Sequence, residues 1–236
     1  MNDPLPSLKI VCFGDSLTLG YQSPTLGLFF LESIPYGTYL QEWAGKRGQV
    51  LVRGVCGETT QDMRLRFQPD VLAHQPQVAI ILGGTNDLGL GISLDVIMEN
   101  LRFFYEQAQA QGILPVAVTV PSLRGEDWST TEAEGGGSAA RLSPAVEQAI
   151  ARRVLLNQSI KDFGEKKCFP VVDWFAETCE PHTQALASEY SNDGLHLTIA
   201  GYHKLAEMVW EQVLKDLLKS QIDGKPGETG GADCSA

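Results

Sequence analysis

A serine, an asparagine and an aspartate–histidine pair stand at positions of this 236-residue sequence where they can do chemistry. Ser16 closely follows the apolar run 8–13, Asn86 follows the run 78–82, and Asp193 precedes His196 by three residues. Acyl transfer needs a hydroxyl nucleophile, an imidazole that takes its proton and a carboxylate that orients the imidazole. The residue types therefore indicate a serine nucleophile, with Ser16 as the attacking group and His196 as its base.

Two further residues can stabilise the negative charge that such a reaction develops. Gly57, after the apolar run 50–55, offers a backbone N–H that no side chain obstructs, and Asn86 can donate from its amide without carrying charge. Each residue also has a structural interpretation: Ser16 can cap a helix, Gly57 can serve only a turn, and Asn86 can form an Asx turn. The signals gain weight together, because ligands of parallel sheets bind beyond the carboxyl ends of the strands.

Five short apolar runs predict the strands that position these groups. They cover residues 8–13, 50–55, 78–82, 114–120 and 169–172, and they are nearly continuous, as in strands buried on both faces. Segments with helical spacing lie at 38–46, 94–111, 144–163 and 198–218. This alternation predicts an α/β fold, a parallel sheet with helices on both faces.

Composition and charge exclude several classes of protein. The 43% of hydrophobic residues suits one α/β domain, expected over 1–218, and the net charge of −11 disfavours nucleic-acid binding. No apolar run approaches the roughly 18 residues of a membrane span. The N-terminus lacks the pattern of a signal peptide, so a cytoplasmic protein is expected. Residues 23–35 and 122–143 are interpreted as inserts, and 219–236 as a disordered tail.

The other histidines and the cysteine beside Gly57 are interpreted as residues without a catalytic role. His74, His182 and His203 lack a nearby carboxylate turn and are interpreted as surface or structural residues. His182, His196 and Asp193 have no recognised metal-ligand spacing, so no metal is expected. Cys56 has no basic neighbour and is interpreted as an inert thiol.

Four blocks of the sequence, in order, resemble the signature of the SGNH (GDSL) hydrolase family. They are Gly14-Asp15-Ser16-Leu17, Gly57 in Gly-Glu-Thr-Thr, Gly84-Thr85-Asn86-Asp87 and Asp193-Gly194-Leu195-His196. The blocks span residues 14 to 196, most of the chain. Ser16 does not lie in a G-x-S-x-G elbow, so the α/β-hydrolase family does not fit.

The resemblance implies a role for each of these residues. Ser16 would be the nucleophile, His196 its base and Asp193 the residue that orients His196, with Asp15 in a supporting role. The oxyanion hole would take its donors from three residues: the backbone N–H groups of Ser16 and Gly57 and the side chain of Asn86. Cys56 departs from the serine that many family members have at its position.

The resemblance also implies a fold and a function. The fold would be a flavodoxin-like three-layer α/β/α sandwich with a five-stranded parallel sheet of order 2-1-3-4-5. The function would be hydrolysis of a carboxylic ester through an acyl-enzyme, without a metal or organic cofactor. The partner would be a small ester: a short- or medium-chain acyl ester, a lysophospholipid or an acetylated sugar. The oligomeric state stays open.

Two alternative functions stay open. An acyltransferase would use the same triad and pass the acyl group to a hydroxyl group. A non-catalytic flavodoxin-like module would hold a phosphate at residues 14–16. This alternative does not explain the spacing of Asp193 and His196. Seven apolar residues are candidates for the walls or lid of an acyl pocket: Leu19, Tyr21, Leu26, Leu28, Phe29, Phe30 and Trp128.

Overall fold

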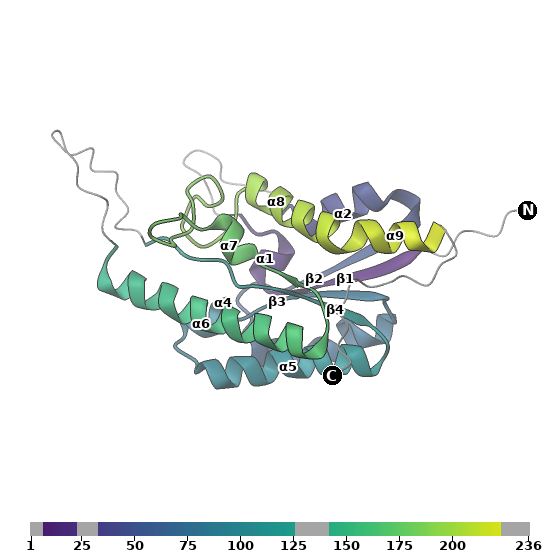
Figure 1. Ribbon diagram of the computed structural model, residues 1–236, viewed down its shortest axis with the longest axis horizontal. Helices are drawn as coiled ribbons and strands as arrows, with labels where there is room; N and C mark the ends of the chain where they lie inside the picture. Colours follow the sequence, from purple (N-terminus) through teal and green to yellow (C-terminus); the bar gives the residue numbers. More distant parts are fainter. Residues whose placement is uncertain (1–6, 23–32, 126–141, 223–236) are drawn as a thin grey trace, which may run out of the picture.

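The computed structural model describes residues 7–22, 33–125 and 142–222 of the chain. Within these ranges, five parallel strands form one sheet in the order β2-β1-β3-β4-β5. They are β1 (Leu8–Gly14), β2 (Gly48–Gly54), β3 (Val78–Leu82), β4 (Leu114–Val118) and β5 (Val171–Val172). Figure 1 shows this sheet between two layers of helices, which confirms the expected α/β fold and strand order.

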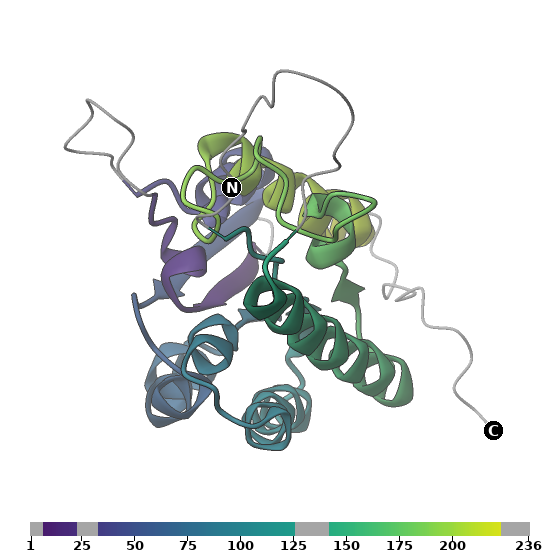
Figure 2. The same ribbon diagram turned by 90° about the vertical axis from the view of Figure 1, so that its left-hand side faces the viewer.

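Helices cover both faces of the sheet (Figures 1 and 2). One face carries α2 (Tyr36–Ala44), α8 (Ile199–Val209) and α9 (Lys215–Ile222), and the other carries α3 (Thr60–Asp70), α5 (Leu94–Ala110) and α6 (Pro144–Lys167). Side chains of a strand alternate between its two faces. Accordingly, Ile10 and Cys12 of β1 belong to the first of these two cores, and Val11 and Phe13 belong to the second.

Short helices follow three of the strands directly. α1 (Ser16–Leu19) comes after β1, α4 (Thr85–Gly89) after β3, and α7 (Trp174–Thr178) after β5. Single turns of 3-10 helix, η1 (Gly45–Arg47) and η2 (Leu72–His74), precede β2 and β3, and a π-helical stretch, η3 (Trp210–Leu214), joins α8 to α9. Strand-to-helix turns therefore occupy the carboxyl edge of the sheet, where the candidate residues lie.

Some predicted boundaries are wrong. β5 begins at Val171 rather than at 169, because the preceding residues end α6: Cys168 takes a left-handed conformation with φ 55°, and the N–H of Phe169 donates to the carbonyl of Gly164. α9 extends to Ile222, so residues 219–222, expected in a tail, are helical. The rest of that tail and most of the two predicted inserts lie outside the described residues.

Candidate active site

The register of the sheet brings three of the predicted segments to one edge. Gly14, the last residue of β1, is paired with Gly54 of β2 and with Leu82 of β3, so the three strands end at one level. The segments that contain Ser16, Gly57 and Asn86 all begin beyond this line. Residues that are 70 positions apart in the sequence therefore lie in one small region of the structure.

Ser16 is the first residue of α1, and it is 6% exposed. The residue that caps the helix is Asp15, whose Oδ1 accepts a hydrogen bond from the N–H of Leu17 at 2.9 Å. The interpretation of Ser16 as a mere cap is therefore wrong. A side chain at Gly14 would have no room, because its Cβ would lie 2.2 Å from the carbonyl oxygen of Leu82. Glycine is thus required where β1 turns into the Ser16 segment.

The carboxylate of Asp193 holds the imidazole of His196. Oδ2 lies 2.8 Å from Nδ1 of His196, while Oδ1 accepts from the N–H groups of Leu195 and His196 at 2.8 Å and 2.7 Å. These backbone bonds hold the carboxylate within the turn 193–196. The turn needs a glycine at position 194, because Gly194 has φ +81°. Asp193 therefore engages Nδ1 of the ring, and Nε2 is the ring nitrogen that the carboxylate does not bind. The predicted aspartate–histidine pair is confirmed as a contact.

Tyr21 connects the Ser16 turn with His196. Its N–H donates to the carbonyl of Ser16 at 3.0 Å, and its ring packs edge-on against the imidazole, with centroids 4.6 Å apart. Its own carbonyl accepts from the hydroxyl of Tyr202, a buried residue of α8, at 2.5 Å. One residue thus contacts both His196 and the turn that contains Ser16.

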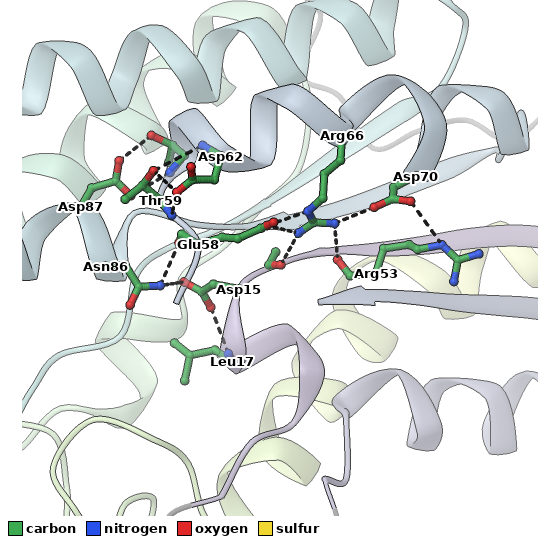
Figure 3. A network of polar contacts seen from close by, with 12 residues as sticks. Asp15, Leu17, Arg53, Glu58, Thr59, Asp62, Arg66, Asp70, Asn86 and Asp87 are labelled. Atoms are coloured by element: carbon green, nitrogen blue, oxygen red, sulfur yellow. Dashed lines mark hydrogen bonds and ion pairs between the residues drawn. The ribbon is translucent and has the colours of Figure 1, made fainter. Parts of the chain in front are cut away.

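Asn86 lies between Asp15 and the loop that follows β2 (Figure 3). Its Nδ2 donates to the carbonyl of Glu58 at 2.8 Å and makes a longer contact of 3.5 Å with Oδ2 of Asp15. These contacts reach two other segments, unlike an Asx turn. Gly57, directly before Glu58, has φ +78°. Nothing lies within 4 Å of the position that a Cβ on Gly57 would occupy. The structure thus gathers these residues near Ser16.

The carboxyl group of Asp15 is completely buried, and burial raises its pKa from 3.8 to about 7. The bond from the N–H of Leu17 and the charge of His196 act in the opposite direction, and the charge of Asp87 adds to the rise. Partial burial raises the pKa of the Cys56 thiol, and the charge of Asp15 adds a smaller rise. Cys56 therefore fits the interpretation as an inert thiol.

The other histidines lie outside this cluster. His74 faces Arg53, with 3.2 Å between its Nε2 and Nη2 of the arginine, while the ring of His203 packs against Tyr39 and Trp43, and His182 is exposed. Among the described residues, no group of three or more histidines, cysteines or acidic residues is arranged to hold a metal ion. No helix in the described ranges is long and apolar enough to cross a bilayer.

The predicted acyl pocket is only partly within the described residues. Leu19 is half-buried, and Tyr21 is 37% exposed beside His196. The remaining candidates lie outside the described ranges: Leu26, Leu28, Phe29, Phe30 and Trp128.

Helix α3 and its polar partners were not predicted from the sequence. The helix buries only three residues, Thr60, Met63 and Phe67, so it gives little apolar periodicity. A signal was present in its capping box, in which Thr59 and Asp62 bond each other's backbone N–H groups. Nothing in the sequence pairs Glu58 with a residue of this helix.

The sequence matches the GDSL-like Lipase/Acylhydrolase family over residues 12–204. An uncharacterized lipoprotein of Bacillus subtilis is 34% identical over 132 residues, which are 49% of this chain and 50% of that protein. The aligned part of the chain thus spans about half the length of this curated relative.

Several solved structures share the fold. A putative acylhydrolase from Bacteroides fragilis has a TM-score of 0.68 at 22% identity, covering 91% of this chain and 92% of its own. A GDSL-like lipase from Bacteroides thetaiotaomicron has a TM-score of 0.67 at 20% identity, covering 88% of each chain. A catalytic mutant of an acetylxylan esterase from Geobacillus stearothermophilus has a TM-score of 0.64 at 20% identity, covering 89% and 95%.

Proposed function

The chain belongs to the GDSL-like lipase/acylhydrolase family, and on this premise we propose that it is a serine esterase whose nucleophile is Ser16. The observation that carries the proposal is the 2.8 Å contact between Oδ2 of Asp193 and Nδ1 of His196. A carboxylate on one ring nitrogen fixes the tautomer that leaves the other nitrogen free to accept a proton. Tyr21 supports the assignment, because it bonds Ser16 and packs against the same ring.

In the proposed acylation step, Oγ of Ser16 attacks the carbonyl carbon of the ester. The hydroxyl proton passes to Nε2 of His196, and the carbonyl π electrons move to oxygen, which gives a tetrahedral oxyanion. The carbonyl then re-forms as the bond to the alcohol oxygen breaks. His196 returns its proton to that oxygen, and the acyl group stays on Ser16. In the second step, water replaces the alcohol and releases the acid by the same sequence.

The oxyanion would be held by the backbone N–H groups of Ser16 and Gly57 and by the amide of Asn86. One hydrogen of the amide is engaged by the carbonyl of Glu58, at 2.8 Å. The other makes only the 3.5 Å contact with Asp15, which is at the limit of a hydrogen bond. We therefore assign this second hydrogen to the oxyanion, with the bond to Glu58 orienting the amide.

A fluorophosphonate probe tests the proposal, since it reacts with activated serines. We expect labelling at Ser16, located by peptide mass spectrometry. We also expect labelling and ester hydrolysis to be lost in Ser16→Ala and His196→Ala. His182→Ala is the matched control, because His182 is exposed and outside the cluster. Labelling at another residue, or full activity in Ser16→Ala, would overturn the assignment.

For the substrate, we propose a small carboxylic ester whose acyl chain is of short or medium length. A panel of p-nitrophenyl esters of increasing chain length measures this preference through kcat/KM. Added alcohols separate hydrolysis from acyl transfer, because a transferase gives a new ester in place of the free acid. A maximal kcat/KM for the longest acyl chains would contradict the proposal.

We also propose a cytoplasmic location, as the sequence predicts. The similar Bacillus subtilis protein is named a lipoprotein, and lipoproteins are anchored to a membrane. A membrane-anchored location is therefore the alternative. Fractionation of the source cells, followed by immunodetection, distinguishes the two. Recovery in the membrane fraction that only detergent releases would contradict a cytoplasmic location.

A further inference from the structure

The guanidinium of Arg66, on α3, bonds acceptors on four other residues (Figure 3). Nε and Nη2 lie 2.6 Å and 2.5 Å from Oε2 of Glu58. Nη2 also donates to the carbonyl of Gly14 at 2.8 Å. Nη1 donates to the carbonyl of Arg53 at 3.1 Å and to Oδ2 of Asp70 at 2.9 Å. The guanidinium thus donates four hydrogen bonds, and the close ion pair between Nη2 and Glu58 adds to them.

Two of these acceptors adjoin the proposed oxyanion-binding groups. The carbonyl of Gly14 lies at the end of β1, two residues before Ser16. Glu58 directly follows Gly57, and its backbone carbonyl accepts the 2.8 Å bond from the side chain of Asn86. One side chain is therefore linked to the three segments that contain the three proposed donors.

The surroundings of this ion pair make it rigid. The side chains of Arg66 and Glu58 are 15% and 17% exposed, so solvent and salt screen their attraction only weakly. The guanidinium also lies over the ring of Phe13, 4.4 Å from its centroid. Lysine cannot replace it, because an ammonium group lacks the planar fork that reaches acceptors on several segments at once.

We propose that Arg66 is the positioning residue of the oxyanion hole: it holds the end of β1 and, through Glu58, fixes the Gly57 loop and the amide of Asn86. The inference rests on the proposed serine esterase function and extends it to a residue that does not touch the substrate. Displacing reacting groups by about 1 Å can cost on the order of 100-fold in rate. Loss of Arg66 should therefore reduce stabilisation of the transition state and leave substrate binding nearly intact.

The test compares Arg66→Lys and Glu58→Gln with the wild-type chain. For Arg66→Lys, we expect kcat per labelled serine to fall by roughly 10- to 100-fold, with KM within about threefold. The Ki of a trifluoromethyl ketone should rise by the same factor as kcat/KM falls, because its adduct with Ser16 places an oxyanion in the hole. Glu58→Gln should show the same pattern, more weakly, since glutamine keeps an acceptor but loses the charge.

Asp70→Asn is the matched control. Asp70 binds the same guanidinium on the side opposite Glu58, so its replacement leaves the bonds of Arg66 to Glu58 and Gly14 in place (Figure 3). We expect its kcat and Ki to stay within twofold of wild type. A purely structural role would instead lower the melting temperature and the fraction of labelled serine in all three variants, with kcat per labelled serine unchanged.

The outcomes separate this inference from the proposed function. Labelled Ser16 with an unchanged kcat in Arg66→Lys overturns the role of Arg66 alone. Full activity in Ser16→Ala overturns the esterase assignment and this inference with it. If Arg66→Lys does not fold, Glu58→Gln decides, since an unchanged kcat and Ki in that variant contradict the proposal.

Discussion

The ring of Tyr21 packs against the imidazole of His196 at an angle of 68°, with centroids 4.6 Å apart. This edge-to-face arrangement is favourable between aromatic rings. Nδ1 of His196 is held by Asp193, so the imidazole contacts the tyrosine ring and the carboxylate separately. The imidazole thus has two supports, and one of them comes from the segment that also contains the proposed nucleophile.

Replacement of Tyr21 tests the first of these supports. We expect Tyr21→Ala to lower kcat by about 3- to 10-fold, because such a ring contact contributes about 1 kcal/mol. Tyr21→Phe keeps the ring and should keep kcat within twofold. Steady-state kinetics with p-nitrophenyl acetate measures both variants. An unchanged kcat in Tyr21→Ala, in a sample with normal labelling of Ser16, would show that the contact does not position His196.

Replacement of Asp193 by asparagine tests the second support. Asparagine keeps an oxygen for the backbone N–H groups of Leu195 and His196, so the turn should survive. Its amide, however, stabilises the wrong tautomer of His196. We expect kcat to fall by roughly 100- to 10,000-fold, with the melting temperature changed by only a few degrees. A loss of kcat below tenfold would remove Asp193 from the triad.

Asn86→Ala tests the side-chain donor of the proposed oxyanion hole. Loss of one such donor costs on the order of 3 kcal/mol of transition-state stabilisation. We therefore expect kcat to fall by about 100-fold or more while KM changes little, as measured over a full substrate titration. Circular dichroism checks that the variant is folded. Turnover close to that of the wild type would exclude Asn86 from the site.

The buried Asp15 predicts an unusual dependence of stability on pH. Its pKa is about 7 in the folded protein and near 3.8 in the unfolded chain, so the folded state binds the proton more tightly between these values. The contribution of Asp15 to the free energy of unfolding is therefore complete below pH 4 and lost as pH rises toward 7 and above, by at most about 4 kcal/mol. Burial is the main cause, since it disfavours the carboxylate.

Asp15→Asn should remove this contribution. Urea unfolding of both proteins at several values from pH 4.5 to pH 8.5 measures the difference in free energy between variant and wild type. We expect the variant to gain stability relative to the wild type as pH rises through this range. A difference that is constant with pH would show that Asp15 does not titrate there.

The strands and the order of the motifs were predictable from the sequence because they depend on local patterns. β3 is a continuous apolar run and β1 is apolar except for Lys9, and glycine and polar residues follow both runs. The strand order was expected only through the family resemblance, since no local pattern states which strands are neighbours. The order is confirmed by the pairing of β1 with both β2 and β3.

The support of the site was not predictable because it depends on contacts between distant residues. Arg66 bonds the carbonyl of Gly14, 52 residues away, and it lies on a helix with few apolar residues. Tyr202 bonds the carbonyl of Tyr21, 181 residues away. In the sequence, such residues look like an ordinary surface arginine and an ordinary core tyrosine, because their roles arise only after the fold has formed.

Gly194→Ala tests whether the turn between Asp193 and His196 depends on its contact with Arg124. Gly194 has φ +81°, and a Cβ there would lie 2.0 Å from the carbonyl oxygen of Arg124. Relief of this overlap would push the turn away from the segment that pairs with it, where the N–H of Arg124 donates to the carbonyl of Gly194 at 2.9 Å. We expect a loss of at least about 2 kcal/mol in the free energy of unfolding and a large fall in kcat.

Gly112→Ala separates the effect of the backbone conformation from the effect of the overlap. Gly112 has a similar φ of +71°, but nothing lies within 4 Å of the place that its Cβ would occupy. Its alanine variant should therefore lose only the roughly 1 kcal/mol that a left-handed alanine costs, and it should keep kcat. Equal losses of stability in the two variants, with kcat retained in both, would show that the Arg124 contact does not hold the proposed catalytic pair in place.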